Sequence, residues 1–340
     1  MIPARQCISV IICAYSLDRW ELLLAAVRAL QAQTLPAKEI IVVIDHHPAL
    51  FTQAKTLLPG VIVLENNAKQ GLSNARNTGI AAAQGELIAF LDDDACPPPL
   101  WLEEFDRALQ PATILGAGSA VVPAWQQQRP GWFPAEFYWV VGCSYLGMPT
   151  VPAEIRNPIG ASMCIRRKVF EEVGGFRSEI GRIGTRPIGC EETELCIRAR
   201  QQWPLQSFRF LPSVSVSHVV PAHRATWSYF FARCYAEGLS KAGISRLVGS
   251  KASLSTENNY TFRTLPQGFL RNLHQALFKR DRWGLARAAA IVLGLTITTL
   301  GYVIGICSPT TIHPNRRAPA IADSNLLWQN HSTGNPGIPS

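Results

Sequence analysis

The first hundred residues alternate between short apolar runs and segments with the spacing of amphipathic helices. The apolar runs predict four buried strands, at residues 8–14, 39–44, 61–64 and 87–91. Helical spacing predicts helices at residues 22–33, 71–84 and 101–109. Strands that alternate with helices form βαβ units, which build a sheet with helices on both of its faces. We therefore expect an α/β fold with a mainly parallel, doubly wound sheet.

Three consecutive aspartates stand where the fourth of these strands ends. Asp92, Asp93 and Asp94 follow the apolar run at 87–91, and the prolines at 97–99 prevent the strand from continuing. In an open α/β sheet, ligands bind at the carboxyl ends of the strands. Adjacent carboxylates repel one another unless a cation offsets their charge, and their hard oxygen atoms suit Mg²⁺ or Mn²⁺. The triplet therefore predicts a metal-bound nucleotide, with a solvated acidic turn as the alternative.

The ends of the first two strands bring further residues to the same edge of the sheet. Ala14 and Tyr15 stand at the end of the first strand, and Asp45 follows the second. Parallel strands end at one edge, so these residues should lie beside the aspartates. The carboxylate of Asp45 is suited to accept hydrogen bonds from a base or from a ribose hydroxyl.

A glycine turn leads into the helix predicted at 71–84. This turn and the first turns of the helix contain Gly71, Asn74 and Arg76. Helix N-termini and arginine side chains both favour phosphate, which makes the segment a candidate phosphate site. A plain turn at Gly71 and a surface ion pair at Arg76 are the alternative interpretations.

An acidic pair and a histidine follow in the second half of the chain. Glu191 and Glu192 open a helix predicted at 191–201, where the helix dipole stabilises carboxylates, and for Glu194 we prefer a structural role. His218 follows an alternating run at 214–217. A single histidine at such a place is either a structural residue or a ligand.

Positive charge is confined to one C-terminal segment. Residues 1–218 contain 19 basic and 20 acidic residues, whereas residues 219–290 contain 11 basic and 3 acidic residues. The segment lacks zinc-finger spacing and RNP-like motifs, so we expect no nucleic-acid partner. A basic segment beside an apolar stretch fits the anionic surface of a membrane instead.

The apolar stretch next to this basic segment is long enough to span a bilayer. Residues 288–307 contain no charged side chain, and about 20 apolar residues cross the hydrocarbon core. We expect a membrane-associated helix at 285–307, within a contact region at 263–307 that either spans the bilayer or lies on it. A soluble core helix is the alternative. Basic residues before the helix place this flank on the cytoplasmic side, and nine cysteines without a CxxC pair favour free thiols in a reducing compartment.

Several of these segments together resemble the GT-A glycosyltransferases of the family 2 type, over about residues 7 to 240. The resemblance rests on the order and spacing of motifs at 10–15, 71–77, 92–94, 160–163, 174–176 and 190–195. It implies a GT-A catalytic domain at 1–218, with a nucleotide-binding half at 1–110 and a smaller, mixed acceptor-binding half at 111–218. A basic helical region at 219–307 and a disordered tail at 308–340 should follow.

The resemblance also implies roles for the candidate residues. The aspartate triplet corresponds to the family's DXD element, in which Asp92 and Asp93 face the nucleotide and Asp94 binds the metal. Asp92 and His218 are the further candidate metal ligands. The nucleotide-sugar donor would contact Ala14, Tyr15, Asp45, Gly71, Asn74 and Arg76, and UDP is the first candidate nucleotide.

The acidic pair matches the family's Glu-Asp element, which carries the catalytic base. Glu192 occupies the base position, where the family often has aspartate, so both Glu191 and Glu192 remain candidates. The base takes the proton of an acceptor hydroxyl as it attacks the anomeric carbon. In this family the reaction is usually inverting.

The implied function is the transfer of one sugar to a glycan or lipid-linked hydroxyl acceptor. The Gln-x-x-Arg-Trp motif of processive synthases is absent, which favours a single addition. A non-catalytic sugar-nucleotide or lipid-carrier binding protein is one alternative. The acidic residues at 92–94 and at 191–192 argue against it, because they match the positions that the reaction requires. A sugar-nucleotide nucleotidyltransferase ranks lower, because no glycine-rich loop follows the first strand.

Overall fold

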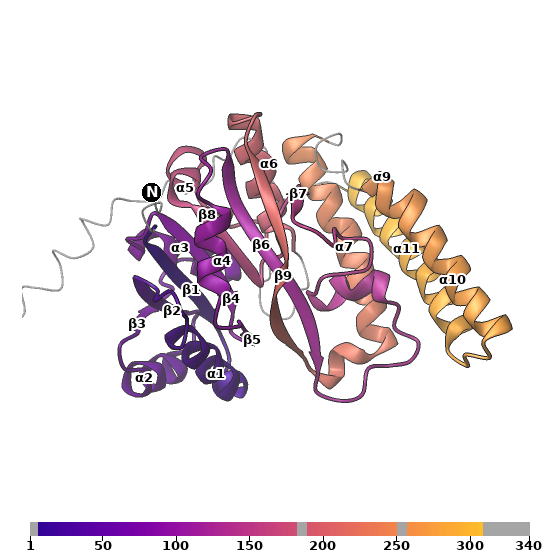
Figure 1. Cartoon of the computed structure of the whole chain (residues 1–340), viewed down its shortest axis with the longest axis horizontal. Helices are drawn as coiled ribbons and strands as arrows, with labels where there is room; N and C mark the ends of the chain where they lie inside the picture. The colour runs from indigo at the N-terminus through magenta and orange to yellow at the C-terminus, as the bar shows by residue number, and fades with distance from the viewer. Residues whose placement is uncertain (1–5, 182–188, 250–256, 309–340) are drawn as a thin grey trace, which may run out of the picture.

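The computed structural model describes residues 6–181, 189–249 and 257–308, which Figure 1 shows as coloured ribbon. Within these ranges, the strands form one nine-stranded sheet. Its order is β3-β2-β1-β4-β8-β6-β9-β5, and the short strand β7 pairs with β9 off this path. A single sheet therefore runs through both of the predicted halves, 1–110 and 111–218.

The first half of the sheet is parallel, as the alternating pattern predicts. Its strands are β1 (Ile8–Ala14), β2 (Glu39–Ile44), β3 (Ile62–Glu65) and β4 (Leu87–Asp92). One face is covered by α1 (Trp20–Gln31), α2 (Pro48–Leu57) and α4 (Trp101–Ala108). The other face is covered by α3 (Leu72–Ala82), α5 (Arg167–Val173) and α6 (Glu191–Gln202). Burial on both faces explains the continuous apolar runs and confirms the doubly wound α/β fold.

The second half of the sheet mixes strand directions. The strand β8 (Ser162–Arg166) runs antiparallel to β4, and β6 (Ile114–Trp125) runs antiparallel to β8. The long strand β9 (Ser207–Val220) lies parallel to β6. It pairs near its start with β7 (Ala153–Ile155) and near its end with the two-residue β5 (Ala95–Cys96). Because β5 follows the aspartate triplet directly, this last pairing links the end of β9 to the carboxyl end of β4.

Most aromatic residues of the segment 112–165 belong to a core that anchors the C-terminal helices. Trp132 stacks on Trp227 at 3.8 Å between ring centroids, and Phe133 and Phe137 pack on Phe230. These side chains join the short helix η2 (Ala135–Val141) and the residues just before it to α7 (Trp227–Val248). Ordinary core packing thus accounts for them, whereas Trp139 and Tyr145 line a cavity described below.

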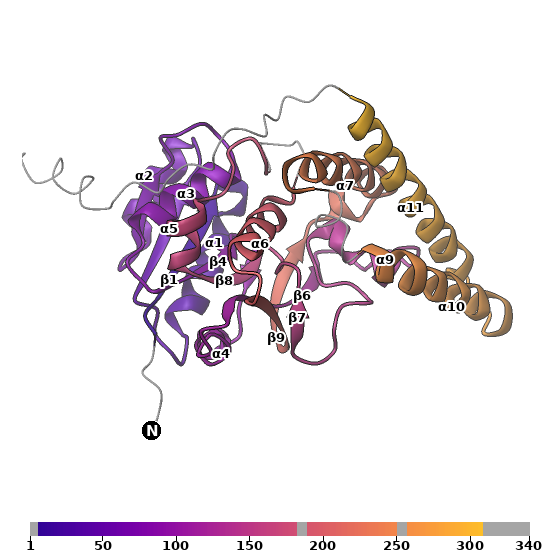
Figure 2. The same ribbon diagram turned by 90° about the horizontal axis from the view of Figure 1, so that it is seen from above.

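The C-terminal part of the region predicted as helical, 219–307, forms two antiparallel helices. The helix α10 (Leu265–Phe278) follows α9 (Glu257–Asn259) and η4 (Tyr260–Thr264), and α11 (Gly284–Cys307) returns beside it (Figure 2). Arg280 adopts a positive φ of 52° in the turn, and Asp281 accepts a hydrogen bond from the backbone N–H of Trp283 at 2.9 Å. The expected tail at 308–340 lies outside the described residues, apart from Ser308.

Small residues allow α11 to pack closely against α7. A Cβ atom added to Gly238 would lie 2.1 Å from the carbonyl oxygen of Thr298, and one added to Gly301 would lie 2.3 Å from that of Tyr235. The two helices therefore contact one another through their backbones. This close packing fixes α11, and with it α10, to α7.

Candidate active site

The aspartate triplet contributes two of its three carboxylates to one cluster. Ligand atoms of Asp92, Asp94 and His218 all lie within 4.8 Å of one another. The Nε2 atom of His218 lies 3.1 Å from Asp94 Oδ1 and 3.8 Å from Asp92 Oδ2. Asp94 is only 4% exposed, so the triplet is not a solvated turn. A cluster of two carboxylates and one imidazole is a donor set that suits a divalent cation.

Strand pairing brings His218 to the aspartates across 124 residues of sequence. Ala95 of β5 stands opposite His218 of β9, and the N–H of Val219 donates to the carbonyl oxygen of Asp94 at 2.9 Å. On its other side, the Nδ1 atom of His218 lies 3.8 Å from Cys143 Sγ. These contacts hold the imidazole with its Nε2 atom facing the carboxylates.

The pKa shifts of Asp94 and His218 show that the cluster favours an ionised carboxylate and a positive partner. Burial alone would raise the pKa of Asp94, but His218, Arg19 and Arg224 lower it well below its usual range. Burial would likewise lower the pKa of His218, but Asp94 raises it to about 10. Among the described residues, no donor is aligned for a hydrogen bond to Asp94 Oδ1, although that atom is buried. The residues present therefore fit a divalent metal, which an oxygen of this kind would bind.

The third carboxylate of the triplet faces a different partner. Asp93 Oδ1 accepts a hydrogen bond from Arg19 Nη1 at 2.6 Å, and the same nitrogen lies 3.1 Å from Asp94 Oδ2. Burial raises the pKa of Asp93 to about 7, although Arg19 opposes this rise. Arg19 also lies over the ring of Tyr15, which is 41% exposed at the end of β1. Arg19 is a site residue that the sequence analysis did not identify, since no local motif marks it.

Arg76 connects the two acidic elements of the chain. Its guanidinium lies 2.8 Å from Glu191 and 3.8 Å from Asp92, and it donates to the carbonyl oxygen of Gly160 at 3.2 Å. The side chain is only 3% exposed, so Arg76 does not form a surface ion pair. Burial would lower the pKa of Arg76, but Glu191 and Asp92 raise it overall. The aspartate triplet and the acidic helix therefore share one buried cation.

The other predicted nucleotide contacts line the ends of the parallel strands. Asp45 accepts hydrogen bonds from Asn66 Nδ2 at 2.7 Å and from the N–H of Gly71 at 3.0 Å. These bonds tie the ends of β2 and β3 to the start of α3. Asn74 donates to the carbonyl oxygen of Lys69 at 2.7 Å, and Ala14 is buried as the last residue of β1. These residues shape the edge of the sheet where a nucleotide was predicted.

The first turn of α6 contains three glutamates, and their carboxylates have different surroundings. Glu191 pairs with Arg76, whereas Glu194 is fully buried between Arg177 and Arg198, at 2.7 and 2.8 Å. Glu192 is half-buried and lines a cavity. Burial and the neighbouring Glu191 raise the pKa of Glu192 to about 8. The surroundings of Glu194 agree with a structural role, whereas Glu192 lines the cavity.

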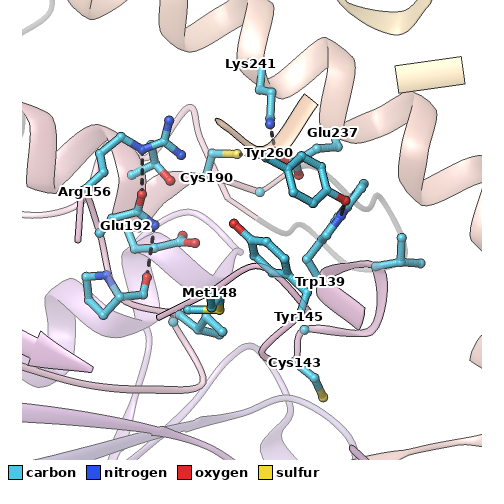
Figure 3. Close-up of a pocket in the computed structure, with 18 of the residues that line it drawn as sticks. Trp139, Cys143, Tyr145, Met148, Arg156, Cys190, Glu192, Glu237, Lys241 and Tyr260 are labelled. Carbon is cyan, nitrogen blue, oxygen red and sulfur yellow. Dashed lines mark hydrogen bonds and ion pairs between the residues drawn. The ribbon is translucent and has the colours of Figure 1, made fainter. Parts of the chain in front are cut away.

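A cavity of about 890 Å³ extends from Asp92 and His218 to the acidic helix α6 and to the C-terminal helices. Asp92, His218 and Arg76 line one end, and Glu192 lines its wall. Figure 3 shows Trp139, Tyr145, Met148 and Tyr260 around the space in front of Glu192. The aromatic composition of 112–165 is typical of a pocket wall as well as of a core, so the sequence did not separate Trp139 and Tyr145, which line the cavity, from the residues that form the core.

Comparison with known proteins agrees with this arrangement. The model of glycosyl transferase family 2 matches residues 9–174. A protein of Haloferax volcanii, glucosyl-dolichyl phosphate glucuronosyltransferase, is 28% identical over 309 residues, which cover 90% of this chain and 98% of the relative. An uncharacterised glycosyltransferase of Nostoc is 35% identical over 113 residues, 32% of this chain and 34% of the relative.

A solved structure supports the fold. The mannosyltransferase from Pyrobaculum calidifontis, solved in complex with GDP-Man and Mn²⁺, superposes with a TM-score of 0.57 and 16% identity. The superposition covers 87% of this chain and 88% of that one. The sequence matches, together with the doubly wound sheet and the acidic elements at its edge, support an enzyme similar to the glycosyltransferases of family 2, with the GT-A fold.

Proposed function

We propose that this enzyme transfers one sugar from a nucleotide-sugar donor to a hydroxyl group of a lipid-linked acceptor, in a reaction that depends on a divalent metal. The observation that supports this most is the single cavity that has Asp92 and His218 at one end and Glu192 on its wall. The name of the Haloferax relative points to a lipid-linked sugar phosphate as a substrate. The complex of the Pyrobaculum enzyme points to a nucleotide sugar and Mn²⁺.

The donor would lie across the carboxyl ends of β1, β2 and β4. Asp92, Asp94 and His218 would hold Mg²⁺ or Mn²⁺, whose charge stabilises a departing nucleoside diphosphate. Tyr15 and Asp45 would face the nucleoside, since they stand at the ends of β1 and β2. Most of these proposed donor contacts come from residues 1–110, which supports the nucleotide-binding half predicted there.

Glu192 is the general base that we propose. Its pKa of about 8 suits a group that must accept a proton near neutral pH, while Glu191 is held by Arg76. The acceptor oxygen would form a bond to the anomeric carbon as the bond from that carbon to the diphosphate breaks. Glu192 would take the hydroxyl proton, and the electron pair of the broken bond would remain on the diphosphate. One displacement of this kind inverts the anomeric centre.

The helices α10 and α11 would hold the enzyme on a membrane surface. Within the described residues, α11 is the one helix that is long and apolar enough to cross a membrane, and 22% of its most apolar stretch is buried. Large apolar side chains remain exposed along both helices, among them Leu270, Leu277, Phe278, Leu285, Val292, Leu300 and Val303. The close packing of α11 on α7 supports peripheral contact rather than a span. Free cysteines and the basic flank support the cytoplasmic side.

The proposed function is tested by incubating the purified protein with a panel of nucleotide sugars, with Mn²⁺ or Mg²⁺, and with lipid-phosphate-linked sugars. We expect one donor to release its nucleoside diphosphate, with a rate that rises on addition of acceptor and falls to background with a chelator. Proton NMR of the product should show inversion at the anomeric carbon. Absence of nucleoside diphosphate release from every donor would contradict the proposal.

The rate of transfer should depend on pH through Glu192. A base acts in its ionised form, so kcat should rise with pH towards a plateau above about 8, the pKa that burial and Glu191 impose on Glu192. In Glu191→Gln the neighbouring negative charge is gone, so the pKa of Glu192 should fall and the rising limb should move to lower pH. The measurement is kcat from pH 5.5 to 9.5 at saturating substrates. A limb that stays in place in Glu191→Gln would argue against Glu192 as the titrating base.

A further inference from the structure

One face of α7 presents a row of charged side chains to the cavity. Arg233, Glu237 and Lys241 follow one another at helical spacing, and all three line the cavity. Glu237 lies 3.4 Å from Arg233 and 3.8 Å from Lys241. Their side chains are 11%, 14% and 19% exposed. A central carboxylate thus orders two cations on the cavity wall, and the row carries one net positive charge.

This row lies close to the proposed base. Cys190 Sγ lies 3.5 Å from Glu237 Oε1, and Cys190 precedes the acidic pair by one residue. Figure 3 shows Glu192, Cys190, Glu237 and Lys241 bordering one space. An acceptor whose hydroxyl reaches Glu192 would therefore extend its remaining groups towards the charged row.

Aromatic rings line the same space. Tyr145 packs edge-on against Tyr260 at 5.2 Å, and Trp139 Nε1 donates to the hydroxyl of Tyr260 at 2.9 Å. Tyr260 in turn donates to the carbonyl oxygen of Glu136 at 2.8 Å. The rings are held in place by these contacts, and aromatic faces suit the C–H faces of a sugar. The space between the rings and the row is suited to a sugar ring.

The helix α11 forms the far wall of the cavity and also has an exposed apolar face. Leu295, Thr298, Thr299 and Tyr302 line the cavity along one side of the helix. Val292, Leu293, Leu300, Val303 and Ile304 are exposed on it. Two of the three threonines that interrupt the apolar sequence of α11, Thr298 and Thr299, are therefore cavity residues. An apolar chain that leaves the cavity past Thr299 meets Leu300 and Val303 next.

We propose that the row on α7 is a phosphate subsite for the acceptor, which is a lipid joined through a phosphodiester to the sugar that is glycosylated. This inference rests on the proposed function and specifies its acceptor. The sugar lies between Glu192 and the aromatic rings, the phosphate lies at Arg233 and Lys241, and the lipid chain leaves along α11. A phosphodiester carries one negative charge, which matches the net charge of the row. A neutral soluble glycan would use neither the row nor the apolar exit.

The test compares two acceptors that differ in phosphate alone, in micelles of a neutral detergent that removes any attraction to anionic phospholipids. One acceptor is glucose joined through a phosphodiester to an octyl chain, and the other is octyl glucoside. In Lys241→Met the KM for the phosphate-bearing acceptor should rise about ten- to a hundredfold, the loss expected for a hydrogen bond to a charged group. The KM for octyl glucoside and the Kd for the donor should not change.

A second variant predicts the opposite direction. Glu237→Gln keeps both cations and raises the net charge of the row, so the KM for the phosphate-bearing acceptor should stay the same or fall. Lys279→Met is the matched control, because Lys279 follows α10 and does not line the cavity. It should leave both KM values unchanged. Thermal unfolding of each variant shows whether the fold is retained.

Several outcomes would overturn the subsite. A KM that rises equally for both acceptors in Lys241→Met, or for neither, would show that the row does not bind phosphate. A rise in KM for the phosphate-bearing acceptor in Glu237→Gln would do the same. A wild-type enzyme that uses its donor but prefers octyl glucoside would overturn the subsite and leave the proposed function standing. A wild-type enzyme that uses no donor would overturn the proposed function itself.

Discussion

Glu192→Gln should lower kcat by about 10²- to 10⁴-fold, the range expected when a general base is removed. Glutamine has nearly the same shape as glutamate but cannot take the acceptor's proton. The proposed donor site lies at the aspartate triplet, so the Kd of the nucleotide sugar should stay within a factor of about 2 of the wild-type value, since the substitution removes no proposed donor contact. The measurements are steady-state kinetics with saturating acceptor and calorimetric titration of the donor.

The neighbouring glutamates are the matched controls for this substitution. Glu191→Gln removes the partner of the buried Arg76, so it should weaken folding and donor binding more than it alters the proton-transfer step. Glu194→Gln removes the partner of Arg177 and Arg198 and should act mainly on stability. A full kcat in Glu192→Gln, together with a lost kcat in a folded Glu191→Gln, would assign the base to Glu191 instead.

Asp94→Asn should abolish metal-dependent donor binding. The carboxylate contributes to the cluster with Asp92 and His218, and its buried Oδ1 atom faces Nε2 of His218. Removing even an outer partner of a metal ligand costs about 10- to 100-fold in affinity, so losing a ligand should cost more than about 100-fold. Mn²⁺ binding is measured by electron paramagnetic resonance, and donor binding by calorimetry with and without a chelator.

Asp93→Asn is the informative comparison for that experiment. Asp93 is adjacent in sequence and equally buried, but it is hydrogen-bonded to Arg19 and lies outside the three-residue cluster. It should retain Mn²⁺ binding while donor affinity falls moderately. Donor binding that is tight in Asp94→Asn and insensitive to the chelator would rule out the metal assignment.

Local sequence was sufficient for the parallel half of the sheet. Buried parallel strands are apolar on both faces, so β1, β2 and β4 appear as continuous apolar runs, and the polar residues that follow them lie at the ligand-binding edge. The strands of the second half of the sheet were harder to predict from the sequence. Its strands β6 and β9 contain glycine, proline and serine, and its aromatic residues serve the core and the cavity alike.

The helix α11 shows how one apolar stretch of sequence can have sides with different neighbours. The uncharged stretch at 288–307 predicted an apolar helix, but the sequence did not distinguish its separate sides. The structure assigns glycines such as Gly301 to the contact with α7, and Thr298 and Thr299 to the cavity. Leu300 and Val303 belong to the exposed face. That distinction depends on which neighbour each side of the helix meets, which hydropathy does not record.

The sequence by itself determined the α/β class, the order of its elements and the residues that stand at the strand ends, because strand and helix periodicity are local properties. Only the tertiary structure decided which of these residues act together. His218 meets Asp94 through the pairing of β9 with β5, Arg76 joins Glu191 to Asp92, and Glu237 lies beside Cys190. Each of these contacts joins residues that are far apart in sequence, and their partners are selected by the packing of the whole sheet and its helices.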